Sequence, residues 1–166
     1  MVLARRLGWP AFYLMDNAFA TSIRLGEWDW ADAELESMIG DDVEPLSRSV
    51  ALSDLISLRA YRGEPTADLA ADLEAIPSSG ADSVKEVTNA FTTAAVAFAT
   101  GRYDLARTEY HRFGATFNQG AAEGFLWAAR CALRSGDLEG ARQDLDQVDA
   151  IERTLGSAVL AARCHL

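Results

Sequence analysis

The fold follows from a motif that is clearest in the stretch Thr100-Gly-Arg-Tyr-Asp-Leu-Ala-Arg-Thr-Glu-Tyr110. It reads glycine, a polar residue, a large apolar residue, an acid, any residue and alanine, with a second large apolar residue four positions after the alanine. Two further stretches follow the same order, Leu25-Gly-Glu-Trp-Asp-Trp-Ala-Asp-Ala-Glu-Leu35 and Ser135-Gly-Asp-Leu-Glu-Gly-Ala-Arg-Gln-Asp-Leu145. A degenerate copy is Arg62-Gly-Glu-Pro-Thr-Ala-Asp-Leu-Ala-Ala-Asp-Leu73. The glycines of these copies are 37, 38 and 35 residues apart, which indicates an internal repeat.

Each copy predicts two antiparallel helices joined by a tight turn at the glycine. Glycine adopts the left-handed conformation that ends many helices. The turns are therefore expected at Gly26, Gly63, Gly101 and Gly136. The apolar-rich first helices are expected over residues 10–25, 45–62, 82–100 and 119–135. No β-strand is expected.

The residues after each glycine have separate predicted roles in the second helix. The large residue two positions later is expected to fill the corner of the hairpin: Trp28, Tyr103 and Leu138. An acid follows in the first turn, where the helix dipole favours negative charge. The alanine five positions after the glycine is expected where the helices cross closely: Ala31, Ala106 and Ala141. In the degenerate copy Pro65 and Asp68 replace the apolar residue and the alanine, so a shifted turn is expected there.

The repeat predicts an all-α fold, a right-handed solenoid of helix hairpins in a single domain over residues 1–166. The expected units are 10–40, 45–77, 82–116 and 119–150, with a half unit over 151–166. Because Ala161-Ala-Arg-Cys-His-Leu166 repeats Ala128-Ala-Arg-Cys-Ala-Leu133, the chain is expected to be a fragment of a larger protein. Self-association through uncapped ends is expected, because their apolar residues lack a following repeat: Leu3, Leu7, Val159, Leu160 and Leu166.

Composition excludes several classes of function. The 166 residues carry a net charge of −10, so the chain as a whole would be repelled by nucleic acid. No apolar run approaches the ~20 residues of a bilayer span, and the N-terminus lacks the apolar region of a secretory signal. The chain has only two cysteines, so a disulfide framework is not expected. We expect a cytoplasmic location.

Few residues have the spacing that catalysis or metal binding requires. Cys131, Cys164, His111 and His165 do not have the spacing of zinc ligands, and the cysteines are expected to be small core residues. A thiol–imidazole pair of Cys131 and His111 lacks an orienting third group. A solvated acidic face is expected on the last helix, made by Glu139, Asp144, Asp146, Asp149 and Glu152. No phosphate-binding or nucleophile-elbow motif is present, so neither an enzyme nor a cofactor is expected.

The helix–turn–helix units with a small residue at the crossing resemble the tetratricopeptide (TPR) family. The looser spacing and the phrases Ala4-Arg-Arg-Leu-Gly8 and Leu25-Gly-Glu-Trp-Asp-Trp-Ala-Asp-Ala33 are similar to degenerate repeat regions of large bacterial signalling proteins. These include LuxR-type and MalT-like ATPase regulators and some nucleotide cyclases. The resemblance implies a non-catalytic protein-interaction or regulatory module in signal transduction or transcriptional regulation, whose partner is a protein or peptide segment.

The resemblance also implies that the first helix of each pair lines a concave groove. The groove candidates are Tyr13, Asp16, Arg24, Tyr61, Phe91, Glu123, Leu126, Arg130 and Arg134. Arginines one turn apart can hold a peptide carboxylate in a bidentate manner. In the alternative interpretation, Arg130 and Arg134 pair with acids of neighbouring helices such as Glu123 or Asp144. A stand-alone TPR adaptor and a small helical enzyme are the alternative functions.

Overall fold

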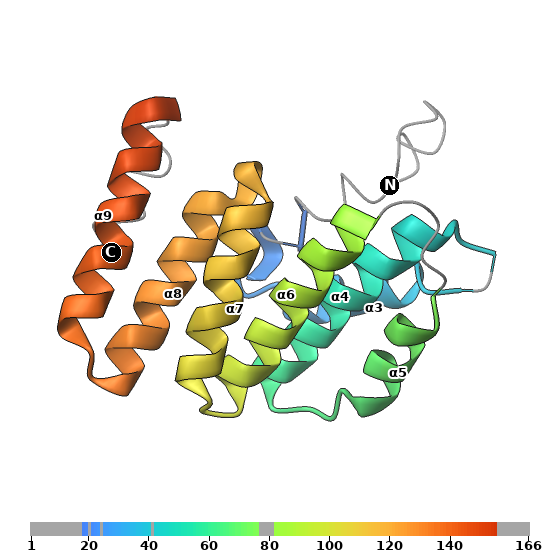
Figure 1. Ribbon diagram of the computed structural model, residues 1–166. Helices are drawn as coiled ribbons and strands as arrows, with labels where there is room; N and C mark the ends of the chain where they lie inside the picture. The colour runs from blue at the N-terminus through green and yellow to red at the C-terminus, as the bar shows by residue number, and fades with distance from the viewer. Residues whose placement is uncertain (1–17, 20, 24, 41, 77–81, 156–166) are drawn as a thin grey trace. The chain divides into compact units, whose positions relative to one another are not determined.

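The computed structural model describes residues 18–155 except 20, 24, 41 and 77–81. No β-strand occurs in the described residues, so the predicted all-α class is confirmed. After a helical segment within residues 18–25, Figure 1 shows these elements in chain order: α3 (Trp28–Glu36), α4 (Pro45–Arg62), α5 (Ala67–Ala75), α6 (Asp82–Ala99), α7 (Tyr103–Thr116), the 3-10 turn η1 (Asn118–Gly120), α8 (Ala121–Ser135) and α9 (Leu138–Leu155). No described helix combines the length and the apolar character needed to cross a bilayer.

The four predicted turn glycines are the described residues with positive φ. The angles are 79° at Gly26, 75° at Gly63, 76° at Gly101 and 84° at Gly136. A helix starts two residues after three of these glycines, at Trp28, Tyr103 and Leu138. After Gly63 the next helix starts only at Ala67, so the shifted turn of the degenerate copy is also confirmed.

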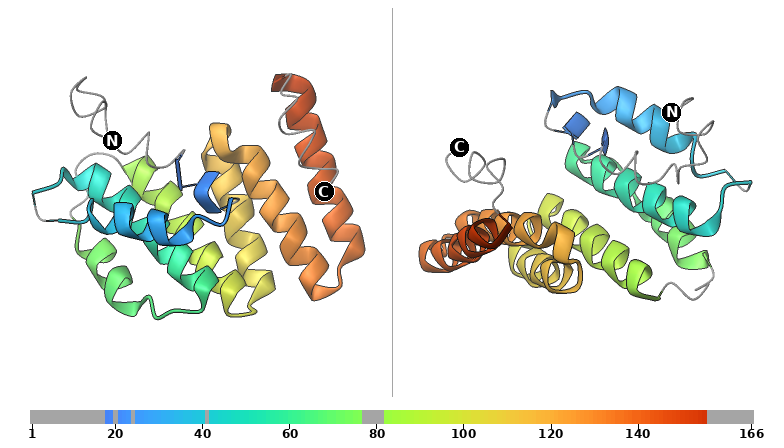
Figure 2. Two further views of the ribbon diagram at one scale, coloured as in Figure 1. Left: turned by 180° about the vertical axis from the view of Figure 1, so that it is seen from behind. Right: turned by 90° about the horizontal axis from the view of Figure 1, so that it is seen from above.

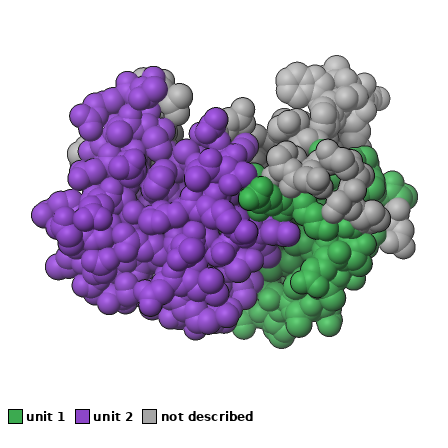
Figure 3. All heavy atoms as spheres, in the orientation of Figure 1, with its two compact units in different colours: residues 1–88 green, residues 89–166 purple. Residues whose placement is uncertain are grey.

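The chain divides into two compact units, residues 1–88 and 89–166, and the division falls within α6 (Figure 3). In the first unit α3 packs on α4, and α4 packs on α5. In the second unit α7 packs on α8, and α8 packs on α9. Figure 2 shows α7, α8 and α9 side by side in the order of the chain.

Helix α4 illustrates how local sequence defines an element. Glu44 caps its start, since its carboxylate accepts hydrogen bonds from the backbone N–H groups of Leu46 (3.0 Å) and Ser47 (2.9 Å). Burial opposes ionisation, but these hydrogen bonds and one from the Ser47 side chain together hold the pKa of Glu44 below its ordinary value. Proline occupies the first helical position, where its missing N–H costs nothing, and Gly63 ends the helix.

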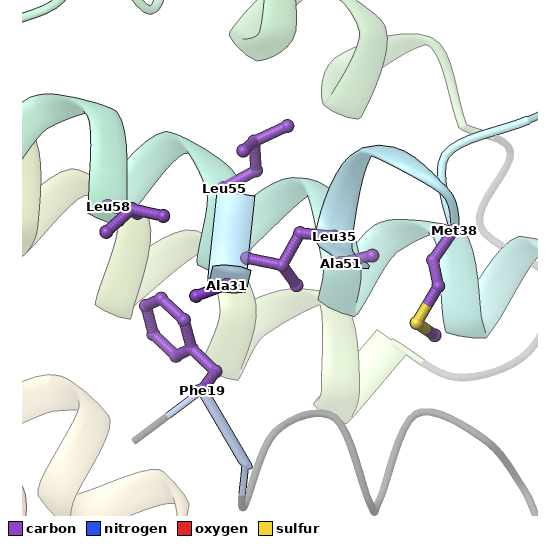
Figure 4. Packing of buried hydrophobic residues seen from close by; sticks show 7 residues of the cluster. All are labelled: Phe19, Ala31, Leu35, Met38, Ala51, Leu55 and Leu58. Atoms are coloured by element: carbon purple, nitrogen blue, oxygen red, sulfur yellow. The ribbon is translucent and has the colours of Figure 1, made fainter. Parts of the chain in front are cut away.

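Alanines at the predicted helix crossings are buried in both units. In the first unit, Ala31 is fully buried among larger apolar residues, which Figure 4 shows. These are Phe19, Leu35, Met38, Leu55 and Leu58, with Ala51. In the second unit Ala106 is fully buried and Ala141 is 2% exposed. The three alanines are therefore buried, as a close helix crossing at these positions requires.

The second unit depends on a close approach of α7 and α8. The buried face of α8 consists of small residues: Ala121, Ala122, Gly124, Ala128, Ala129, Cys131 and Ala132. A Cβ atom on Gly124 would lie 2.7 Å from the carbonyl oxygen of Tyr110 and 3.0 Å from the Cα of Gly114. Larger residues pack around this contact, since Tyr110 is fully buried and Trp127 stacks on its ring at 5.6 Å between centroids.

One predicted packing role was wrong. Leu138 does not fill the corner of its hairpin, because its side chain is 71% exposed. By contrast Trp28 and Tyr103, at the equivalent positions, are half-buried and pack against the two cores. Trp28 also donates a hydrogen bond from Nε1 to the carbonyl oxygen of Ile23 (3.0 Å). Trp30, two residues after Trp28, is 44% exposed. The apolar terminal residues Leu3, Leu7, Val159, Leu160 and Leu166 lie outside the described residues.

Candidate protein-binding site

Helix α8 has two faces of opposite character. Its inner face carries the small buried residues, whereas the outward stripe follows helical spacing through Glu123, Leu126, Arg130 and Arg134. The two arginines are exposed, and Glu123 and Leu126 are half-buried. Leu133, beside Arg134, is 53% exposed. The outward stripe thus offers two cations and an apolar side chain to solvent.

Both arginines of this stripe lie over aromatic rings. The guanidinium carbon of Arg130 lies 4.5 Å from the centroid of the Trp127 ring. That of Arg134 lies 5.9 Å from the centroid of the Tyr103 ring, which belongs to α7. Such cation–π contacts attract the guanidinium to the ring face and leave its edge, with the N–H donors, free. We call Trp127, Tyr103, Arg130 and Arg134 the arginine–aromatic face.

The rings that support the arginines are themselves fixed by packing. Phe98 lies edge-on to Tyr103 at 5.7 Å and to Trp127 at 5.3 Å between centroids. Trp127 stacks on Tyr110 with an interplanar angle of 15°. Because aromatic rings have few rotatable bonds and these rings contact one another, the two guanidinium groups have a preformed support.

The arginines of this face have no carboxylate partner among the described residues, in contrast to Arg59, Arg62, Arg107 and Arg112. In the first unit Arg59 pairs with Asp32 (3.1 Å), and also with Glu36. Arg62 pairs with Asp29 at 2.6 Å. The alternative interpretation, in which Arg130 and Arg134 pair with Glu123 or Asp144, is therefore wrong.

The other groove candidates divide into three groups. Tyr13, Asp16 and Arg24 lie outside the described residues. Tyr61 on α4 is half-buried and belongs to the first unit. Phe91 on α6 is half-buried and packs against Phe113 (5.2 Å between centroids) and Tyr110 (6.2 Å).

Arg107, His111 and Asp144 form a buried charge network in the second unit that the sequence did not predict. Asp144 of α9 is 4% exposed, so the expectation that it belongs to a solvated acidic face was wrong. Its carboxylate accepts hydrogen bonds from Nε of Arg107 (2.9 Å) and contacts Nε2 of His111 at 2.7 Å. The helical spacing of the sequence could have predicted this burial, because Asp144 lies three residues after Ala141 and four before Val148, both of which are buried. Glu139, Asp146 and Asp149 are exposed as expected.

The network continues into the turn between α8 and α9. Nη1 of Arg107 donates to Asp137 at 2.8 Å, and the other oxygen of Asp137 accepts a hydrogen bond from the backbone N–H of Gly140 at 2.9 Å. This hydrogen bond and the Arg107 guanidinium hold the pKa of Asp137 below its ordinary value. The network therefore attaches both the first turn and the middle of α9 to α7.

Cys131 lies close to this network but is unsuited to nucleophilic chemistry. It is fully buried, as expected for a small core residue, and burial raises the pKa of its thiol to about 11. A reactive cysteine needs the thiolate, which such an environment disfavours. Asp144 supplies the orienting acid that the sequence analysis could not name for His111, yet the thiol beside them is protonated at neutral pH. Among the described residues no group of three or more side chains is arranged to bind a metal ion.

Comparisons with known proteins returned nothing for this chain: no family model matches it, and neither a curated protein nor a solved structure is similar to it.

Proposed function

We propose that this chain is a non-catalytic protein-interaction module and that the arginine–aromatic face of α8 is a docking surface for a segment of another protein. The observation that supports this most directly is the pair of exposed arginines that lie over aromatic rings and have no carboxylate partner among the described residues. Arginine and large aromatic residues are the types that contribute most to binding energy at protein interfaces.

The arrangement of helices supports the same conclusion. Hairpins with a left-handed glycine turn and a buried alanine at the crossing recur along the chain, as in TPR-like arrays. A solenoid of such hairpins presents one helix of each pair on an extended surface, and α8 is a first helix of its pair. We propose, on the resemblance to repeat regions of bacterial signalling proteins, that the module acts in signal transduction or transcriptional regulation.

The test is affinity capture from a bacterial lysate with two variants of equal charge. Arg130→Ala/Arg134→Ala removes the cations of the face. Arg142→Ala/Arg153→Ala removes two exposed arginines of α9 and is the matched control. We expect quantitative mass spectrometry to find partners bound by the wild type and the control but lost by the first variant. Partners retained by both variants would contradict the proposed surface.

A further inference from the structure

The two guanidinium groups of the arginine–aromatic face occupy separate positions. Arg130 lies over Trp127 of its own helix, whereas Arg134 lies over Tyr103 of α7. Phe98 contacts both rings edge-on. Each guanidinium group therefore has an aromatic ring of its own as support.

We propose that this face recognises a segment carrying two carboxylates on one side, one for each arginine; this rests on the proposed function above. The free edge of each guanidinium offers parallel N–H donors that match a carboxylate in a bidentate geometry. Positions one helical turn apart on α8 are separated by about 6 Å along the axis. Side chains on one side of an extended chain repeat every two residues, at about 6.6–6.8 Å. An extended segment with acids at alternate positions therefore fits the two arginines.

The charge of the whole chain limits what the rest of the partner can be. The net charge of −10 repels an acidic protein at long range. At physiological ionic strength this repulsion is screened beyond about 8 Å, whereas contacts at the guanidinium groups are not. The partner is thus an acidic segment in an otherwise neutral or basic protein.

The test uses fluorescein-labelled ten-residue peptides and fluorescence polarisation. The probe alternates Glu and Ser, and the control replaces every Glu by Gln. A third peptide is the Gln/Ser control with one phosphoserine. We expect the Glu/Ser peptide to bind the wild type about 2- to 30-fold more tightly than the Gln/Ser control, the scale of two exposed charged pairs.

Variants of the protein test whether both arginines take part. Arg130→Gln and Arg134→Gln should each weaken Glu/Ser binding severalfold, and the double variant should bind it no better than the Gln/Ser control. Arg142→Gln/Arg153→Gln, with the same loss of charge on α9, should bind like the wild type. Circular dichroism checks that the variants fold, which is expected because the substituted side chains are exposed.

Three outcomes would overturn the inference: equal binding of the Glu/Ser and Gln/Ser peptides, unchanged Glu/Ser binding by the double variant, or tighter binding of the phosphoserine peptide than of the Glu/Ser peptide. Failure here is distinguishable from failure of the proposed docking surface. If the lysate partners are still lost by Arg130→Ala/Arg134→Ala while acidic peptides show no preference, the face binds protein by a different chemistry.

Discussion

The close contact of α7 and α8 predicts that Gly124→Ala destabilises the second unit. In an ordinary helix this substitution stabilises by about 1 kcal/mol, because alanine has the higher helix propensity. Here the new Cβ would lie 2.7 Å from the carbonyl oxygen of Tyr110 and 3.0 Å from the Cα and N of Gly114. These are backbone atoms, so the helices must move apart. Overpacking of this kind costs about 1–3 kcal/mol. With overlap against rigid backbone at the upper end of that range, we expect a net loss of about 2 kcal/mol.

Urea unfolding followed by tryptophan fluorescence measures this loss, since Trp127 lies on α8 and stacks on Tyr110. Gly114→Ala is the matched control. Its Cβ would meet the carbonyl oxygen of Ala121 at 3.2 Å, a milder overlap that we expect the propensity gain to offset within about 1 kcal/mol. If Gly124→Ala is as stable as the wild type, or more stable, α7 and α8 do not approach as closely as described.

Three further predictions concern the repeat and its core. Ala106→Leu should destabilise the protein by about 1–3 kcal/mol through overpacking, whereas Ala67→Leu, at an exposed position of the degenerate unit, should change the free energy of unfolding little. Chemical denaturation measures both variants. Equal effects would show that the helix crossing is not at Ala106. Gly101→Ala should lower the free energy of unfolding by about 1–2 kcal/mol through backbone strain alone, because φ is 76° and no atom lies within 4 Å of the added Cβ. A Tm equal to that of the wild type would argue against the left-handed turn. Burial raises the pKa of the Cys131 thiol from 9.0 to about 11, so the free energy of unfolding of the wild type should fall by up to about 3 kcal/mol as the pH rises from 9 towards 11. Cys131→Ala lacks the thiol and should lose less stability over this range. Equal losses in the wild type and the variant would contradict the buried thiol.

The hairpins could be predicted because their determinants are local. A glycine with φ near +80°, an acid in the next turn and an alanine at the crossing lie within six residues of one another. The sequence therefore predicted the turn glycines, and α4 begins and ends at the predicted residues. Even the departure of the degenerate copy was visible, because Pro65 and Asp68 break the local pattern.

The side-chain partners could not be predicted because they join residues distant in the sequence. Asp144 binds Arg107, 37 residues earlier, and His111, 33 residues earlier. The density of acids along α9 predicted a solvated face, and only the three- and four-residue spacing to Ala141 and Val148 marked this one as buried. Which arginines pair and which remain available depends on the same distant contacts. Arg107 pairs with Asp144, whereas Arg130 lies over Trp127 and has no carboxylate partner among the described residues.

The two faces of α8 separate the residues that stabilise the core from the residues that we propose to bind a partner. Small residues on the inner face let α7 approach to backbone contact at Gly124, and the core of the second unit depends on that approach. The cations extend from the opposite side and rest on rings that packing already fixes, so they contribute little to the core. Substitutions at Arg130 and Arg134 should therefore leave the unfolding free energy within about 0.5 kcal/mol of the wild type, as is usual for surface changes away from the core. A much larger loss of stability would mean that the arginines serve the fold, and the case for a docking surface on this helix would fail with it.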